Sequence, residues 1–424
     1  MLSNTTKPRL SRILPLIVLA LAALAAVGCA GAPSRGWSGP LVSDNVLYVG
    51  TLQGKILALD LTTADLSEGL APETKWDPLD VVGSLGGGGF SCGRVSTPMG
   101  LYGTPAVKNG KVYIGAYDGN VLYVTTNGEV SGTKFKTGGP IVGSVVIDGD
   151  TLFVGSTDGK LYALSLDLKE KWYFKTEGKI WSTPVVTNGV VYVASADHNL
   201  YAIDAESGNE IWRFETKAAI MSTPLVAKGK VYIGGCDRKF YSVDAATEEE
   251  RLAANARENG SPSDLTRDAS SVFEGASNWF WTQALVHNGE IWVGNLDHKV
   301  YVLNAENVEE EVHDPYPTGG MVYAPPVLLG GLIVVGSQDG KIYAINTGNK
   351  DFAAYAIDAK TEEIVQSPEK PKNLLAPILA PLYPDSEDGI VYFHAQDGTH
   401  TLYALRLSAS SAEVLWSKRT DVIK

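Results

Sequence analysis

The chain has 424 residues, a formal net charge of −13, 44% hydrophobic residues and 20% charged residues. This length suffices for one large core or two ordinary ones, and the composition is that of a folded globular protein. So acidic a chain lacks the basic surface that nucleic-acid binding requires, and we expect no nucleic-acid partner. Abundant Gly, Val, Tyr and Trp, without long Leu/Ala/Glu/Lys-rich blocks, favour strands over helices.

Residues 1–28 are typical of an export signal. Three basic residues precede an apolar run, residues 13–28, that is too short and ends too abruptly for a membrane span. The run stops at AVGC, which resembles the bacterial lipobox, although Ala26 stands where Leu is commonest. We therefore expect lipidation of Cys29 and an extracytoplasmic protein anchored to the cell membrane or outer membrane. The alternative is an ordinary signal peptide that is cut nearby.

Removal of the signal leaves a more acidic chain with few cysteines. The three cations of residues 1–28 are lost with no anion, so the net charge of −13 becomes −16. Apart from Cys29, the mature chain contains Cys92 and Cys236. A disulfide persists outside the cytoplasm, but sequence does not show whether two cysteines are near each other. A Cys92–Cys236 bridge and two free thiols both stay open.

An internal repeat fills the rest of the chain. In residues 182–216, apolar runs alternate with an Asn-Gly turn, an Asp-centred turn and a longer polar turn, which predicts four short strands joined by three turns. The compact copies are about 40 residues apart, the period of a four-stranded propeller blade. Eight copies begin at Ser38, Gly103, Gly143, Ser182, Ser222, Thr282, Ala324 and Ala380.

The repeat predicts an all-β fold. After a short tether over residues 29–36, we expect residues 37–424 to form a single eight-bladed β-propeller of four-stranded antiparallel blades. A seven-bladed ring with one degenerate copy is the alternative. The ring is expected to close by packing of the first and last blades, without an exchanged strand. Three segments interrupt the period as insertions: residues 66–100, residues 248–275 with a short helix and a polar loop, and residues 349–373 between blades seven and eight.

Two Asp-His pairs invite a metal hypothesis, but the repeat predicts another role. Histidine occupies a turn position that is usually glycine, which requires a backbone that tolerates positive φ. The histidines lie on different blades, and no third ligand stands at metal spacing. The aligned turns read Gln53-Gly54, Asp118-Gly119, Asp158-Gly159, Asp197-His198, Asp237-Arg238, Asp297-His298, Asp339-Gly340 and Asp397-Gly398.

The stretch AIDAESGNEIW, which ends at Trp212, resembles the tryptophan-docking repeat of the quinoprotein propellers. Looser versions end at Trp172 and Trp416. The resemblance implies that each outer-strand tryptophan packs against the neighbouring blade. It covers essentially all of the mature chain and is specific for fold rather than function.

Two branches of that family differ in function. The dehydrogenase branch implies pyrroloquinoline quinone (PQQ), a calcium ion and a catalytic Asp. This chain is much shorter, lacks the vicinal Cys-Cys pair of many alcohol dehydrogenases, and has no calcium ligand set that can be assigned. We therefore expect no cofactor, neither PQQ nor calcium. The other branch, the lipid-anchored propellers similar to BamB, consists of non-enzymatic scaffolds, and the signal, lipobox and length resemble this branch.

One repeat position gathers large side chains. It lies two residues before a Thr-Pro-like step, at the start of the innermost strand, so these residues are expected to surround one mouth of a central channel and form a binding platform. Packing between blades without a ligand is the alternative. The binding candidates are Trp37, Tyr102, Trp181, Met221, Trp281 and Tyr323, with Val142 in the same register. Two residues further on, Thr104, Ser144, Thr183, Thr223 and Gln283 are expected to line the channel.

We expect no catalytic residues. The string GFSCG around Ser91 matches a hydrolase motif but lies in a Gly-rich segment rather than at a strand-to-helix turn. The sequence predicts a lipid-anchored, non-enzymatic scaffold, monomeric on its own, that binds membrane or envelope proteins. The alternatives are a PQQ-dependent dehydrogenase and a propeller that senses glycans or peptides.

Overall fold

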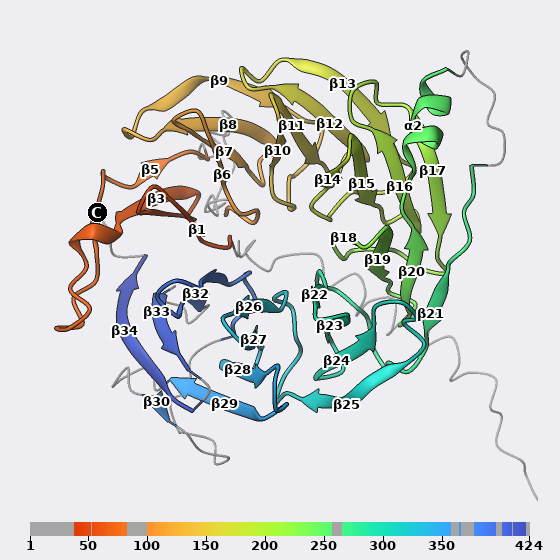
Figure 1. Ribbon diagram of the computed structural model, residues 1–424. Coiled ribbons are helices and arrows are strands. Elements are labelled where there is room, and N and C mark those ends of the chain that lie inside the picture. The colour runs from red at the N-terminus through yellow and green to blue at the C-terminus, as the bar shows by residue number, and fades with distance from the viewer. Residues whose placement is uncertain are drawn as a thin grey trace, which may run out of the picture.

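Eight sheets are arranged in a ring (Figure 1). The computed structural model describes residues 38–51, 53–82, 100–256, 265–357, 364–365, 377–395, 401–408 and 410–420. Each sheet consists of strands consecutive in sequence and is therefore one blade. The eight-bladed prediction is confirmed, and the seven-bladed alternative is wrong.

Each of the first four blades is an antiparallel meander that runs from the ring axis to its rim (Figure 1). Blade 1 contains β1 (Leu41–Ser43), β2 (Val46–Gly50), β3 (Lys55–Asp60), the 3-10 turn η2 (Leu61–Thr63), β4 (Glu73–Thr74) and β5 (Leu79–Asp80). Blade 2 contains β6 (Ala106–Lys108), β7 (Lys111–Gly115), β8 (Asn120–Thr125) and β9 (Val130–Lys136). Blade 3 contains β10 (Val146–Asp148), β11 (Thr151–Gly155), β12 (Lys160–Ser165) and β13 (Glu170–Lys175). Blade 4 contains β14 (Val185–Thr187), β15 (Val190–Ala194), β16 (Asn199–Asp204) and β17 (Glu210–Glu215).

The last four blades continue the same order. Blade 5 contains β18 (Leu225–Ala227), β19 (Lys230–Gly234), β20 (Phe240–Asp244), the helix α2 (Glu248–Asn255) and β21 (Ser271–Phe273). Blade 6 contains β22 (Leu285–His287), β23 (Glu290–Asn295), β24 (Lys299–Asn304) and β25 (Glu311–Pro317). Blade 7 contains β26 (Val327–Leu329), β27 (Leu332–Gly336), β28 (Lys341–Asn346), β29 (Phe352–Ile357) and β30 (Ile364–Val365). Blade 8 contains β31 (Tyr383–Asp385), β32 (Ile390–Ala395), β33 (Thr401–Leu407) and β34 (Ala412–Arg419).

The hydrophobic core lies between blades. The buried residues form eight clusters, each shared by two neighbouring blades. One of these clusters joins Leu47 and Leu57 of blade 1 to Tyr392 and Trp416 of blade 8. Among the described residues blades 1 and 8 share no strand, so the ring closes without an exchanged strand, as the sequence predicts. Hydrogen bonds add to the packing, since the Tyr383 hydroxyl donates to the carbonyl oxygen of Val42 at 3.4 Å.

The outer-strand tryptophans dock onto the next blade. The indole of Trp172 donates from Nε1 to the carbonyl oxygen of Ala205 in blade 4, at 3.3 Å. Trp212 lies in the core cluster shared by blades 4 and 5, and Trp416 in the one shared by blades 8 and 1. In blade 1, Trp76 has this role, since its Nε1 donates to the carbonyl oxygen of Thr126 at 3.4 Å. The packing implied by the repeat is present.

The boundaries of the three insertions require correction. Each segment also contributes an outer strand: β4 and β5 lie in residues 66–100, β21 in 248–275 and β29 in 349–373. These strands are short or lack a docking tryptophan, so the sequence pattern does not mark them. They form because each pairs with the third strand of its blade.

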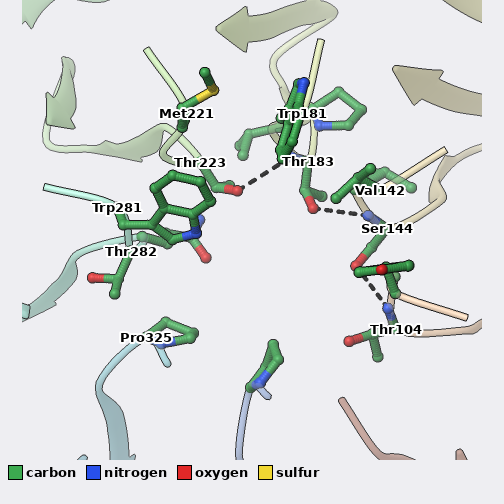
Figure 2. Close-up of a pocket in the computed structure, with 18 of the residues that line it drawn as sticks. Thr104, Val142, Ser144, Trp181, Thr183, Met221, Thr223, Trp281, Thr282 and Pro325 are labelled. Carbon is green, nitrogen blue, oxygen red and sulfur yellow. Dashed lines mark hydrogen bonds between the residues drawn. The ribbon is translucent and has the colours of Figure 1, made fainter. Parts of the chain in front are cut away.

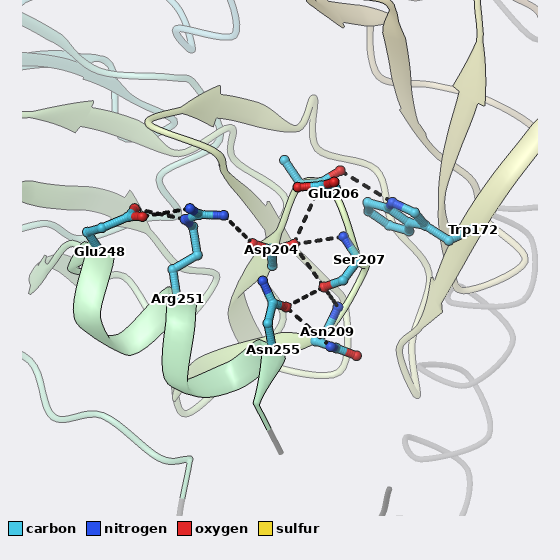
Figure 3. A network of polar contacts seen from close by, with 9 residues as sticks. Trp172, Asp204, Glu206, Ser207, Asn209, Glu248, Arg251 and Asn255 are labelled. Carbon is cyan, nitrogen blue, oxygen red and sulfur yellow. Dashed lines mark hydrogen bonds and ion pairs between the residues drawn. The ribbon is translucent and has the colours of Figure 1, made fainter. Parts of the chain in front are cut away.

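The predicted short helix in residues 248–275 is α2, which is tied to blade 4. It begins with a capping box in which the Thr247 hydroxyl accepts from the backbone N–H of Glu250. Arg251 reaches the buried Asp204 carboxylate at 2.8 Å (Figure 3). Among the described residues, no helix has the length and apolar character needed to cross a bilayer.

Candidate functional site

The predicted platform residues line a single cavity where blades 2 to 8 converge, called the axial pocket below. Its volume is about 460 Å³. Trp181, Met221 and Trp281 project into this region from blades 4, 5 and 6 (Figure 2). The platform positions that line it are Tyr102, Val142, Trp181, Met221, Trp281 and Tyr323, together with Leu379 of blade 8. Trp37 lies outside the described residues.

Edge-to-face contacts hold the aromatic rings of the axial pocket. The centroids of Trp181 and Trp281 are 6.3 Å apart at 87°, although blade 5 separates their blades. Trp281 and Tyr323 are 6.2 Å apart at 74°. Such pairs add about 0.5–1.5 kcal/mol each beyond their buried area. The wall is therefore an ordered array of ring faces and edges.

A chain of hydroxyl contacts joins the innermost strands beneath the rings. The Ser144 hydroxyl accepts from the backbone N–H of Thr104 at 2.9 Å, and Thr183 Oγ1 accepts from the N–H of Ser144 at 2.9 Å. Thr223 Oγ1 accepts from the N–H of Thr183 at 3.2 Å (Figure 2). Gln283 donates from Nε2 to the carbonyl oxygen of Pro224 at 2.9 Å. These side chains tie adjacent blades and also face the axial pocket.

The described lining of the axial pocket carries no charge. Among the described residues that line it there is no Asp, Glu, His, Lys, Arg or Cys. Burial raises the pKa of the Tyr323 phenol, so this group keeps its proton at neutral pH. In the part of the chain that the structure describes, the site offers aromatic surface and hydroxyl groups but no acid–base pair for proton transfer.

The lining does not fit a PQQ–calcium centre. Calcium takes oxygen ligands, with carboxylates prominent among them. No carboxylate is present among the lining residues that the structure describes. Over the described part of the chain there is also no group of three or more His, Cys, Asp or Glu side chains able to hold a metal ion.

The Asp-His pairs are turn residues, as the repeat predicts. His198 has a φ of 78° and His298 one of 69°, close to the 83° of Gly119 in the equivalent position. Asp197 Oδ1 accepts from the backbone N–H of Asn199 at 3.0 Å. Its Oδ2 accepts from the Tyr201 hydroxyl at 2.9 Å and from the N–H of Glu177 at 2.8 Å. The aspartate thus fixes its own turn and joins it to the preceding blade.

Substitutions of His198 test the backbone requirement. His198→Gly is expected to change the free energy of unfolding by less than about 1 kcal/mol, because glycine adopts positive φ without strain. His198→Val is expected to lower it by about 1–2 kcal/mol, since a β-branched side chain is strained there. Urea denaturation measures both values. A valine variant as stable as the wild type would show that the turn does not impose this conformation.

The remaining sequence candidates do not join the axial pocket. Ser91, Cys92 and Cys29 lie outside the described residues. Cys236 is a half-buried thiol, and burial together with the neighbouring Asp237 raises its pKa to about 11. At neutral pH it is a protonated, weakly reactive group.

Sequence reasoning missed several pocket residues. Leu379, Pro325 and Pro381 belong to the same two registers as the predicted lining residues. The stretch ILAP, residues 378–381, carries the repeat signal, but the last copy is looser than the others, so its signal is weak. Trp279, two residues before Trp281 in the chain, is 44% exposed.

The repeat matches a known family. A model of the family described as outer membrane protein assembly factor BamB matches residues 94–172 and 169–307, half of the chain. The chain belongs to this family. No curated protein matches the chain.

Solved structures share the fold of this BamB-family chain. A computationally designed protein, Ika8, matches with a TM-score of 0.63 and 15% identity, over 88% of this chain and 97% of its own. BamB from Moraxella catarrhalis matches with a TM-score of 0.57 and 14% identity, over 86% of this chain and 92% of its own. At such low identity these likenesses show the propeller fold alone.

Proposed function

We propose that this BamB-family propeller is exported, anchored by a lipid on Cys29, and acts without catalysis as a scaffold that binds proteins at the cell envelope. The observation that carries the proposal is the axial pocket, whose described lining residues bring aromatic and hydroxyl groups but no acid, base or metal ligand. Such a lining suits recognition rather than bond cleavage. Family membership supports a place in the envelope.

The tether sets the position of the scaffold. About eight residues separate Cys29 from Trp37, and an extended chain spans at most about 3.3–3.6 Å per residue. The ring therefore stays within about 30 Å of the lipid. Because the ring is held this close to the lipid, its partners are proteins embedded in or held at the same membrane. The mature chain carries a net charge of −16, since removal of the signal takes three cations from a whole chain of net charge −13.

Cys29→Ser is expected to release the protein from the membrane. Lipidation needs the thiol, and the variant is expressed behind a signal peptide that is cleaved without lipidation, so that the apolar run of residues 13–28 does not remain as a second anchor. Sedimentation of cell lysates, followed by immunoblotting, measures the partition. The expected result is wild type in the pellet and the variant in the supernatant. A variant that stays in membranes after a high-salt wash would contradict lipid anchoring through Cys29.

The scaffold role is tested in cells by site-specific photocrosslinking. A photoreactive residue at Trp181 is expected to give a discrete adduct with an envelope protein. The same residue at Tyr173, which is 50% exposed on β13 at the rim, is the control. Absence of any adduct at Trp181, or adducts of equal yield at both positions, would count against a partner at the axial pocket.

A further inference from the structure

We infer that a cavity between blades 7 and 8 binds an indole or phenol side chain of a partner protein, with the Leu407 carbonyl oxygen as hydrogen-bond acceptor. The inference rests on the proposed protein-binding function and adds a second contact outside the axial pocket. Three features support it: the aromatic side chains that occupy the equivalent position in the other seven blades, the cavity found in blade 7 instead, and its uncharged lining.

Seven blades place an aromatic side chain at the same point of their second strand. In blade 4, Tyr192 pairs with Val185 and lies in the core cluster shared with blade 5. In blade 7 the equivalent residue is Val334, which pairs with Val327 and lies in the cluster shared with blade 8. From blade 1 to blade 8 this position holds Tyr48, Tyr113, Phe153, Tyr192, Tyr232, Trp292, Val334 and Tyr392.

The outer strand of blade 7 does not supply the missing ring. In blade 4 the row of paired residues that contains Tyr192 continues outward to the docking tryptophan Trp212. In blade 7 the same row runs from Val334 through Ala344 to Ala353. Among the described residues, blade 7 therefore brings no aromatic group to either of the two positions that fill this side of the other blade interfaces.

The aromatic groups at these two positions bond a particular carbonyl of the next blade. It belongs to the first residue after the third strand, or to its equivalent. Because this carbonyl lies between two packed blades, an indole N–H or a phenol O–H gives it a partner away from solvent. The pairs are Trp76 with Thr126, Tyr113 with Leu166, Trp172 with Ala205 and Tyr232 with Ala305, at 2.6–3.4 Å.

Leu407 has the equivalent carbonyl in blade 8. The backbone N–H of Ala205 donates to the carbonyl oxygen of Gly189 at 2.8 Å, and that of Leu407 donates to the carbonyl oxygen of Gly389 at 3.0 Å. The two residues thus have the same place in their blades. The aliphatic side chains that blade 7 offers at the two aromatic positions have no hydrogen-bond donor for the Leu407 carbonyl.

A cavity of about 440 Å³, called the interblade cavity below, lies at this carbonyl. Its wall includes Gly331 and Thr347 of blade 7 and Gly389 and Leu407 of blade 8. A Cβ atom added to Gly331 would meet no atom within 4 Å, so the space beside this turn is open. The volume lies within the usual range of ligand sites, about 300–1,000 Å³.

The lining favours an uncharged ring with one donor. No charged and no aromatic residue stands among the described residues that line the interblade cavity. The corresponding cavities between blades 2 and 3 and between blades 4 and 5 differ, since Tyr113 and Tyr192 stand in their walls beside charged residues such as Lys111 and Lys228. A charged ligand would lose hydration here without gaining an ionic partner, whereas an aromatic ring gains from burial.

The insertion beside the interblade cavity does not provide such a ring. Residues 358–376, which connect blade 7 to blade 8, contain no Phe, Tyr, Trp or His. The ring is therefore assigned to a partner protein, as the scaffold function requires. A tryptophan or tyrosine of the partner would repeat the docking that joins the other blades of the ring.

Binding is measured by isothermal titration of the full-length protein, purified in a mild detergent, with N-acetyltryptophanamide. We expect saturable binding with a Kd of about 1 mM or below. Ala353→Trp supplies the indole from the protein itself and is expected to weaken binding at least about tenfold. It is also expected to raise the melting temperature, because it fills a cavity. Val334→Tyr is a second blocking variant.

Two controls accompany the blocking variants. Thr133→Trp, on β9 of blade 2, adds an indole to a blade that already has Tyr113, and it is expected to leave the affinity unchanged. The 1-methyl derivative of N-acetyltryptophanamide keeps the ring but lacks the indole N–H. It is expected to bind severalfold more weakly, since the Leu407 carbonyl then has no donor.

Four results would overturn the inference. They are no detectable binding at millimolar concentration, and equal binding of the 1-methyl derivative. Binding that is lost in Trp281→Ala but kept in both blocking variants would place the ring in the axial pocket. An apparent mass that rises with protein concentration in the wild type but not in Ala353→Trp would assign the cavity to a second copy of the chain. Membrane partition and crosslinking at Trp181 do not depend on this cavity, so failure of the proposed function remains distinguishable.

Discussion

Phe280→Ala is expected to lower the free energy of unfolding by about 3–5 kcal/mol, the largest loss we expect from a single substitution in this protein. Phe280 is fully buried between blades 5 and 6. Its ring lies 5.4 Å from Phe240 and 5.9 Å from Tyr301, measured between centroids. Alanine would leave a cavity between the two blades in addition to the lost transfer free energy.

The neighbouring tryptophan gives a matched control. Trp279 precedes Phe280 in the chain but is 44% exposed. Trp279→Ala is expected to change stability by less than about 1 kcal/mol. Both values come from urea denaturation followed by circular dichroism. A loss below about 1 kcal/mol in Phe280→Ala would mean that the interface between blades 5 and 6 repacks or contributes little.

Asp204→Ala is expected to lower the free energy of unfolding by about 2–4 kcal/mol at pH 7. The Asp204 side chain has no exposed surface. It accepts from the N–H of Ser207 at 2.7 Å and from Nη1 of Arg251 on α2 at 2.8 Å (Figure 3). Its loss leaves buried donors without an acceptor and detaches α2 from blade 4.

The same carboxylate predicts a pH dependence. Burial raises the pKa of Asp204, but hydrogen bonds from Ser207 and Arg251 outweigh it, so the folded pKa lies below the ordinary value. A lowered folded pKa stabilises the protein above the unfolded value, about 3.9, and this contribution is lost as the pH falls through the folded pKa. The stability gap between wild type and Asp204→Ala should therefore narrow below about pH 4.

Glu248 provides the control for Asp204. It binds the same Arg251 guanidinium at 2.6 Å, but its side chain is 62% exposed. Glu248→Gln is expected to have a much smaller effect, because solvent screens exposed ion pairs. An Asp204→Ala variant no less stable than Glu248→Gln, or a stability gap that stays constant from pH 7 to pH 3, would contradict a role for the buried carboxylate.

The sequence by itself determined the features that depend on residues close together in the chain, such as turns and inner strands. Eight copies of one pattern predict eight blades, because each copy contains its own turns and inner strands, and the structure confirms this number over the seven-bladed alternative. Other blades have glycine at the turn position that His198 occupies, which predicts a positive φ for His198. Its φ in the structure is 78°. The register of Trp181 and Trp281 predicts that both line the axis, since equivalent residues of a ring face a common centre.

Tertiary structure alone decided the features that depend on a partner far along the chain. The outer strands β4, β21 and β29 have weak patterns, and they exist because the third strand of their blade pairs with them. Of these, β4 and β21 are edge strands, whereas β29 also pairs with β30. The edge-to-face contact of Trp181 with Trp281 spans an intervening blade. Arg251 meets Asp204 because the return of the chain after β20 places α2 against blade 4. Local sequence does not determine these contacts, because the ring geometry sets which blades and insertions become neighbours.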